Sequence, residues 1–225
     1  MAALLARTIA GFVFLFTVMG LVILGAAGTV YFWQGWAMIA TFAACSGLIT
    51  VWLWRHDKAL LERRTKAGPG AEADPMQNVV QALAGIVFLA MIAVPGLDHR
   101  FGWSAVPIVG VVAGDLLIAV GFLIVFLVFR ANTFTSGTIE IAENQTVIDT
   151  GPYALVRHPM YSGALVMFVG MPLALGSWWG LAPAAGILPI LGWRLSREES
   201  FLVDNLAGYQ AYRAKVRHRL VPYLW

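Results

Sequence analysis

Long apolar stretches separated by short polar segments dominate this sequence. A helix needs about 20 apolar residues to cross the roughly 30 Å hydrocarbon core of a bilayer. Four stretches come close to that length or exceed it: 9–27, 35–54, 79–97 and 106–129. The pattern predicts four membrane-spanning helices. The first stretch lacks the cleavage pattern of a signal peptide, so we expect it to be retained.

Two shorter apolar stretches, 160–175 and 180–195, follow on either side of a turn segment. Each can form roughly 24 Å of helix at a rise of about 1.5 Å per residue. We expect them to form a short, tilted helical hairpin. The chain is therefore predicted to be an all-α polytopic membrane protein with about six transmembrane helices.

Composition and charge agree with this topology. Hydrophobic residues make up 60% of the chain and charged residues only 12%, too little polar surface to cover a soluble globule. With six spans, 14 of the 15 Lys and Arg residues fall on one side of the membrane, and only Arg100 falls on the other. The positive-inside rule places the first side in the cytoplasm. We expect a bacterial inner (plasma) membrane protein with both termini cytoplasmic, and no nucleic-acid partner.

Two of the predicted cytoplasmic segments have patterns of their own. In the segment 130–158, apolar and polar residues alternate over 138–141 and 146–149, which predicts a short β-hairpin. The segment 196–225 predicts one amphipathic helix before a basic end. Its apolar face would carry Phe201, Leu202, Leu206, Tyr209 and Tyr212.

The segment 151–163, Gly-Pro-Tyr-Ala-Leu-Val-Arg-His-Pro-Met-Tyr-Ser-Gly, joins the fourth and fifth predicted spans. Pro159 suits the first turn of a helix, where its missing N–H costs nothing and its fixed φ favours initiation. Free N–H groups at that helix start, beside Arg157 and His158, favour an anionic ligand. Taken singly, Arg157 pairing with a lipid phosphate and His158 capping the helix stay open as alternatives.

Carboxylates form a second candidate cluster. Glu198 and Glu199 are neighbours on a predicted helix and point about 100° apart, so one of them can face a groove. Arg194 or Arg197 could neutralise them, and a ligand with an ammonium and hydroxyl groups would do so equally well. Asp115, inside the fourth span, is a second-rank candidate. The histidines lack the spacing of a zinc site, so we expect no metal.

Gly-Pro-Tyr, then Arg-His-Pro-Met-Tyr, a hydrophobic hairpin and Glu-Glu resemble a known superfamily. It comprises the integral membrane methyltransferases related to isoprenylcysteine carboxyl methyltransferase and phospholipid N-methyltransferase. The resemblance covers about 132–223. It implies an S-adenosylmethionine pocket on the cytoplasmic side, closed by C-terminal helices. The residues that it assigns to cofactor binding are Tyr153, Arg157, His158, Pro159, Tyr161, Glu198 and Glu199.

The resemblance implies two parts: N-terminal helices with a basic connector (1–105) and a methyltransferase core (106–225). The implied reaction is S-adenosylmethionine-dependent methyl transfer to a lipophilic or small thiol or carboxylate acceptor at the cytoplasmic face. The partners are then the lipid bilayer and that acceptor, whose identity stays open between an isoprenyl cysteine, a phospholipid amine, a small thiol and an isoprenoid lipid. No catalytic residue and no oligomeric state follow from the sequence.

Two other functions remain as alternatives. An NADPH-dependent membrane reductase of the sterol reductase type has a similar C-terminal core, but its relatives tend to carry Asn-Tyr-x-Gly-Glu after the proline, where this chain has 160–164 Met-Tyr-Ser-Gly-Ala. A transporter or assembly subunit would use an intramembrane acid such as Asp115, but two inverted halves are not visible in the sequence.

Overall fold

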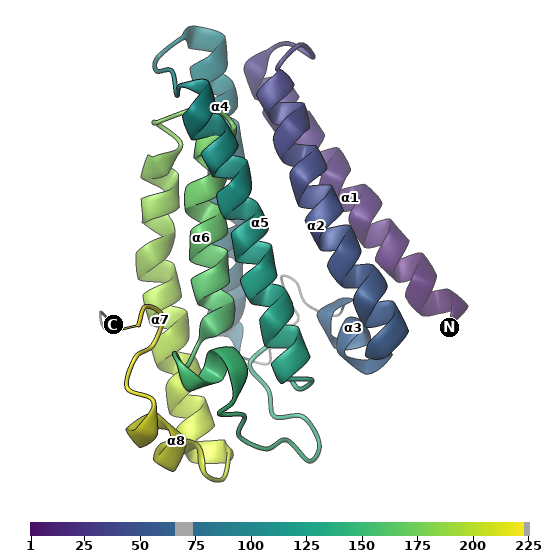
Figure 1. Cartoon of the computed structure of the whole chain (residues 1–225), viewed down its shortest axis with the longest axis vertical. Coiled ribbons are helices and arrows are strands. Elements are labelled where there is room, and N and C mark those ends of the chain that lie inside the picture. Colours follow the sequence, from purple (N-terminus) through teal and green to yellow (C-terminus); the bar gives the residue numbers. More distant parts are fainter. Residues whose placement is uncertain (66–73, 223–225) are drawn as a thin grey trace.

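The computed structural model describes residues 1–65 and 74–222 and is mainly helical (Figure 1). Within these residues no strand occurs, which confirms the all-α class. The helices are α1 (Ala2–Ala27), α2 (Trp33–His56), α3 (Lys58–Thr65), α4 (Pro75–Phe101), α5 (Ile108–Ala131), the 3-10 helix η1 (Gly151–Ala154), α6 (Pro159–Ala174), α7 (Leu181–Asn205) and α8 (Tyr209–Lys215).

Four of these helices, α1, α2, α4 and α5, are long and apolar enough to cross a membrane, in agreement with the four long apolar stretches. The predicted hairpin is present as α6 and α7, but α6 has only 16 residues. The apolar part of α7 ends at Leu195, and the helix continues for ten polar-rich residues to Asn205. Six crossings are therefore not confirmed, although all six helices run roughly alongside one another (Figure 1).

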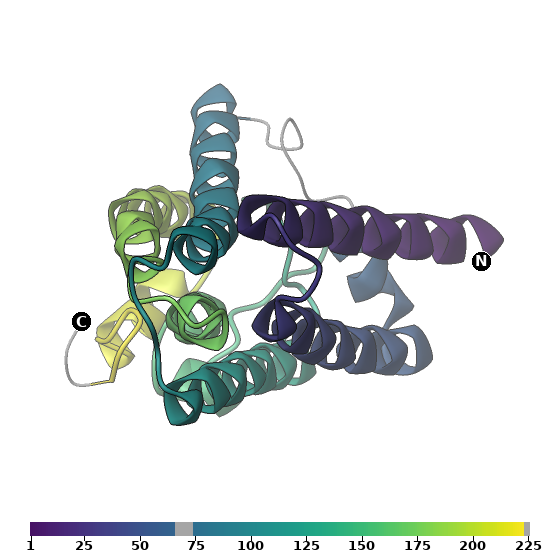
Figure 2. The same cartoon turned by 90° about the horizontal axis from the view of Figure 1, so that it is seen from above.

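Helix α6 lies at the centre of the C-terminal part. Seen from above, α4, α5 and α7 surround it, while α1 and α2 lie together to one side (Figure 2). The chain alternates direction, so the loop before α6, the end of α7 and α8 all gather at the end of the bundle where α1 begins (Figure 1). That end carries the candidate site.

Glycines bring α5 and α6 into backbone contact. A Cβ added at Gly121 would lie 2.6 Å from the carbonyl oxygen of Gly163, and one at Gly170 would lie 2.7 Å from that of Gly114. One at Gly114 would meet the backbone nitrogen of Ala174 at 2.2 Å. Small residues are the usual means by which helices pack closely in membranes, where burial of apolar surface drives association little. The tight pair fixes where α6 begins.

At the end of the bundle away from the candidate site, a buried carboxylate links neighbouring segments. Asp98 of α4 is 1% exposed and accepts hydrogen bonds from the Ser177 hydroxyl and from both the backbone N–H and the hydroxyl of Ser104. The Ser177 hydroxyl in turn accepts the N–H of Gly180 at 3.1 Å. Because the Asp98 carboxylate and the two serine hydroxyls are all hydrogen-bonded, this cluster anchors the turn between α6 and α7 to the end of α4.

The predicted β-hairpin is wrong. Residues 132–150 form an irregular loop, with a turn at Asn144 (φ 58°) close to the predicted reversal. Side chains, not a partner strand, hold its backbone: Arg64 donates to the Ser136 carbonyl at 2.9 Å and Arg194 to that of Gly137 at 3.1 Å. Consecutive residues of both alternating stretches line a cavity, so the alternation does not separate a buried face from an exposed one.

The prediction of a single amphipathic C-terminal helix is also wrong. Gly208 adopts φ 85°, a left-handed conformation that breaks the helix and separates α7 from α8. The apolar face is nonetheless real, since Leu206, Tyr209 and Tyr212 form one buried cluster with Val216. The break folds α8 back over the end of α7.

Candidate functional site

The joint 151–163 adopts the local structure that its prolines favour. Pro152 lies in η1, and Pro159 is the first residue of α6, with His158 as the N-cap. The backbone N–H groups of Arg157 and His158 donate at 2.9 Å to the carbonyls of His218 and Arg219, respectively. The chain after α8 therefore pairs with the joint and closes this end of the molecule.

Arg157 and Glu199 form a buried ion pair. Arg157 Nε donates to Glu199 Oε1 at 2.6 Å, and the two side chains are only 5% and 4% exposed. Arg157 Nη1 also donates to the carbonyls of Val216 at 2.8 Å and Arg217 at 2.7 Å. Arg219 Nη2 reaches Glu199 Oε2 at 3.2 Å. A desolvated pair of this kind is stable only when its remaining groups are also paired, as they are here.

His158 lies between two carboxylates. Its Nε2 is 3.2 Å from Glu199 Oε1, and its Nδ1 is 3.7 Å from Glu198 Oε1. The imidazole is 5% exposed and comes from the first turn of α6, whereas both glutamates come from α7. His158 therefore joins the beginning of one helix of the hairpin to the far end of the other.

Glu198 takes part in a second chain of hydrogen bonds. The Tyr161 hydroxyl donates to Glu198 Oε2 at 2.8 Å, and Arg194 Nε donates to the same hydroxyl at 2.9 Å. Arg194 also reaches the side-chain oxygen of Gln77 at 3.3 Å. These contacts fix the orientation of the Glu198 carboxylate, whose side chain remains 24% exposed.

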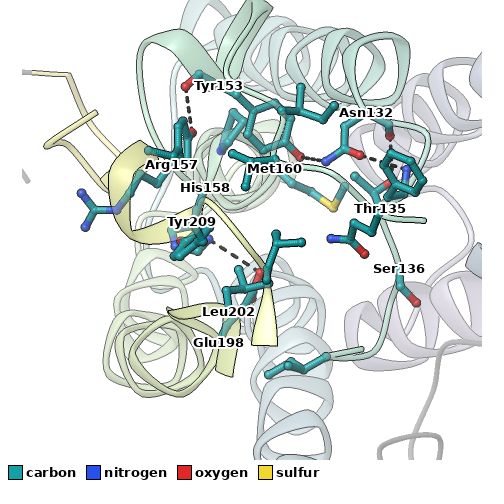
Figure 3. A pocket seen from close by; sticks show the side chains of 18 of the residues that line it. Asn132, Thr135, Ser136, Tyr153, Arg157, His158, Met160, Glu198, Leu202 and Tyr209 are labelled. Atoms are coloured by element: carbon teal, nitrogen blue, oxygen red, sulfur yellow. Dashed lines mark hydrogen bonds and ion pairs between the residues drawn. The ribbon is translucent and has the colours of Figure 1, made fainter. Parts of the chain in front are cut away.

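A cavity of about 140 Å³ opens in front of these residues (Figure 3). The joint, α7, α8 and the 132–150 loop surround it, so the lining draws on residues spread from Asn132 to Tyr212 in the sequence. Of the seven predicted residues, six line the cavity: Tyr153, Arg157, His158, Pro159, Tyr161 and Glu198. The seventh, Glu199, is not part of the lining; it lies 3% exposed behind Arg157 and His158 and holds both.

Several lining residues were not expected from the sequence. Asn132 donates to the Tyr153 hydroxyl at 3.1 Å, and the Tyr212 hydroxyl donates to the Tyr153 carbonyl at 2.8 Å. Tyr209 is 4% exposed, and its buried hydroxyl has no hydrogen-bond partner within residues 1–65 and 74–222. A buried polar group without a partner is uncommon, and at a cavity wall it marks a position where a ligand can complete the bonding.

Burial and neighbouring charges shift the pKa values of ionisable groups in the cavity wall and behind it. Burial alone would raise the pKa of Glu199, but hydrogen bonds from His158 and Arg157 and the charges of both lower it to about 2. Burial raises the pKa of Tyr153 to about 12, although the hydrogen bond from Asn132 opposes this. Glu199 is therefore ionised and Tyr153 neutral at physiological pH.

Asp115 lies apart from this cluster. It is near the other end of α5, where Thr41 of α2 hydrogen-bonds its carboxylate and Oδ1 has no partner. Arg197, considered as a partner for the glutamates, instead pairs with Asp74 at 3.4 Å on the surface. Neither residue is brought to the cavity.

Comparison with known families identifies the part of the chain that carries this site. The model of the phospholipid methyltransferase family matches residues 109–207, which include α5, α6, α7, the joint and both glutamates. The match confirms the resemblance to the superfamily of integral membrane methyltransferases. The comparison with curated proteins gave no match.

Proposed function

We propose that the protein transfers a methyl group from S-adenosylmethionine to a lipophilic or small thiol or carboxylate acceptor. The match of residues 109–207 to the phospholipid methyltransferase family model supports this proposal. The proposed reaction takes place at the cytoplasmic face of the membrane. One observation carries the proposal: the cationic start of α6, the Glu198 carboxylate and four tyrosines line a single cavity.

The chemistry of the lining suits this cofactor. Glu198 offers a partially exposed carboxylate to an ammonium or to ribose hydroxyls. Arg157 offers positive charge to a carboxylate, and Tyr153 and Tyr209 offer aromatic faces to an adenine. The Tyr209 hydroxyl has no hydrogen-bond partner among the described residues, so a ligand that reached it would supply one. When bound, S-adenosylmethionine supplies an activated methyl group on its sulfonium.

The cavity is smaller than a usual ligand pocket, so binding of the cofactor requires a change of shape. Ligand pockets usually enclose about 300–1,000 Å³, whereas this one holds about 140 Å³. The loop 132–150 covers it, and side-chain bonds from Arg64 and Arg194 hold that loop in place. Binding of S-adenosylmethionine therefore requires the loop to shift outward. Such a shift breaks these bonds, or those of Thr133 with Asp57 and of Lys215 with Asp149.

The residues of the chain would contribute alignment and the exclusion of water. Glu199 keeps Arg157 and His158 in position, and Arg194 with Tyr161 keeps Glu198 in position. Holding two reactants in line can lower a barrier by about 7–11 kcal/mol in well-oriented cases. A thiolate or carboxylate acceptor carries no proton to be removed, so the site needs no general base for these classes.

The test is thermal stabilisation of the detergent-purified protein by S-adenosylhomocysteine, the demethylated cofactor. We expect the unfolding midpoint to rise with ligand concentration, as it must when a ligand binds only the folded state. Glu198→Gln should reduce the rise, because it removes the charge that faces the cavity. Asp204→Asn is the matched control, since Asp204 lies exposed on the same helix, α7.

A folded sample that shows no shift at saturating S-adenosylhomocysteine would overturn the proposal. A shift produced by NADPH in its place would favour the reductase alternative. Methyl-labelled cofactor incubated with membranes would then identify the acceptor, because label recovered in lipid, protein or volatile fractions separates the acceptor classes.

A further inference from the structure

A second hollow lies on the opposite face of the joint. It is a groove of about 670 Å³ between the last two turns of α5, the joint and the chain after α8. Ile124, Leu127, Leu155, Val156 and Leu220 line it. Pro159 borders both this groove and the cavity described above, so the joint separates the two spaces.

Only one side chain in the lining of the groove is charged. This residue is Arg130, in the last turn of α5. Its side chain is exposed, and its guanidinium lies 5.9 Å from the ring centre of Phe126. It forms no ion pair with any residue in the described part of the chain. An unneutralised cation at one edge of an apolar groove complements a molecule with a negative head and an apolar tail.

The position of the groove indicates where such a molecule would come from. Ile124 and Leu127 belong to α5, a helix long and apolar enough to span the membrane, so the groove continues the lipid-facing surface of that helix. Leu155 lies beyond the end of α5 and is still 62% exposed. Large apolar side chains exposed on both sides of the helix end are expected where a protein contacts the interfacial region of a bilayer.

We propose that this groove binds one anionic phospholipid from the surrounding leaflet, with its phosphate at Arg130 and an acyl chain along Leu127, Leu155 and Leu220. A soluble protein partner is less suited to the site, because the groove adjoins α5, a helix apolar enough to lie in a bilayer. The bound lipid would pack against the back of the joint whose other face carries Arg157 and His158. This inference does not depend on the identity of the cofactor or of the methyl acceptor.

Native mass spectrometry of the detergent-purified protein tests the inference. The probes are dioleoylphosphatidylglycerol, dioleoylphosphatidylcholine and the soluble headgroup glycerophosphoglycerol. We expect the wild-type protein to retain the anionic lipid best and the soluble headgroup hardly at all. Arg130→Ala should weaken binding of phosphatidylglycerol about fivefold, the usual effect of one cation near an anionic lipid, and should change phosphatidylcholine binding much less.

Two further variants separate a specific site from general attraction. Arg55→Ala is the matched control, because Arg55 is also an exposed cation in the last turn of a spanning helix, α2, and does not line the groove. It should leave binding of both lipids unchanged. Leu155→Gln should weaken both lipids, since it removes apolar contact without touching the charge.

The inference is overturned if Arg130→Ala and Arg55→Ala reduce phosphatidylglycerol binding equally, because the attraction would then be a property of the whole surface. It is also overturned if Leu155→Gln has no effect, or if the soluble headgroup binds as well as the lipid, because the groove would then hold no acyl chain. Methyl transfer is not measured in any of these experiments, so their failure and a failure of the proposed function are distinguishable.

Discussion

The α5–α6 pair and the α1–α2 pair use the same residue types in different ways. In α5 and α6, glycines bring two backbones into contact, and a Cβ at Gly121 would have no space. In α1 and α2, four of the five glycines, Gly11, Gly20, Gly25 and Gly47, face open space, and Gly35 lies closest to a side chain, that of Ile23, and not to the backbone of α1. The spanning part of α1 or α2 is 11% buried inside the protein, compared with 28% for α4 and α5. Hydropathy is high in all four helices, so it does not distinguish these roles.

This difference indicates where the molecule must be rigid. The joint follows α5 and begins α6, so the close packing of that pair determines where Arg157 and His158 lie relative to α7. The family match begins at residue 109, at the start of α5, and leaves out α1, α2 and α4. The N-terminal pair is attached mainly through α4, where Gly96 lies against the backbone of α1. The predictions below test whether stability and function depend on the first pair more than on the second.

The largest effect is expected at the buried ion pair. Arg157→Ala leaves Glu199 buried and without its closest cation, and breaking such a pair costs about 3–5 kcal/mol of unfolding free energy. Denaturant unfolding in detergent measures this loss, and binding of S-adenosylhomocysteine should be lost with it. Arg55→Ala, at the exposed end of α2, should change the unfolding free energy by no more than about 0.5 kcal/mol. Equal losses in the two variants would contradict the contrast between the regions.

The glycine contacts should give the next largest difference. Gly121→Ala forces a methyl group against the Gly163 carbonyl and the Met167 side chain, and overpacking of this kind costs about 1–3 kcal/mol. Gly47→Ala in α2 meets nothing within 4 Å, and it should be neutral or stabilising because Ala favours helix. Thermal unfolding of the two variants side by side checks the prediction. A more stable Gly121→Ala protein would show that α5 and α6 can separate without cost.

Hydroxyl groups allow a third comparison. Ser177 joins Asp98 to the turn between α6 and α7. The Ser46 hydroxyl instead bonds within its own helix, to the carbonyls of Phe42 at 2.6 Å and Ala43 at 3.4 Å. Ser177→Ala leaves a buried carboxylate with one donor fewer, at a cost of about 1–3 kcal/mol. Ser46→Ala should cost less than about 0.5 kcal/mol, since its carbonyl partners are already bonded within the helix. Unfolding midpoints of both variants distinguish the two roles.

The sequence predicted those features that depend on local pattern. The four long spans, the hairpin formed by α6 and α7, and the helix start at Pro159 follow from hydropathy and from proline geometry, and the structure has all of them. The spatial meeting of His158 with Glu198 and Glu199 followed from the membrane topology together with the resemblance. In these cases the residue types themselves, such as an apolar run or a proline, indicate the structure.

Other features depend on contacts between distant residues and could not be predicted. The loop 132–150 alternates like a strand, but it has no partner strand and takes its shape from Arg64, Arg194 and the cavity. Because Glu198 and Glu199 are neighbours on a helix, the sequence suggested that only one of them would face a groove. Which one does so depends on Arg157, which lies 42 residues before Glu199 and pairs with it. The glycines of α1 and α5 look alike in the sequence because only the partner helix decides whether a glycine is needed.

The smallest effect is expected from pH and concerns the site alone. The pKa of Glu199 is lowered from 4.5 to about 2, so its contribution to stability is complete above pH 4.5 and is lost as the pH falls toward 2. At pH 4 the loss should be below about 1 kcal/mol. Other carboxylates titrate in the same range, so the measurement is the difference between wild type and Glu199→Gln in thermal unfolding at pH 7 and pH 4. The wild type should lose part of its advantage over the variant at pH 4, because glutamine cannot titrate; an advantage that grows on acidification would show that burial, and not Arg157 and His158, sets the pKa of Glu199.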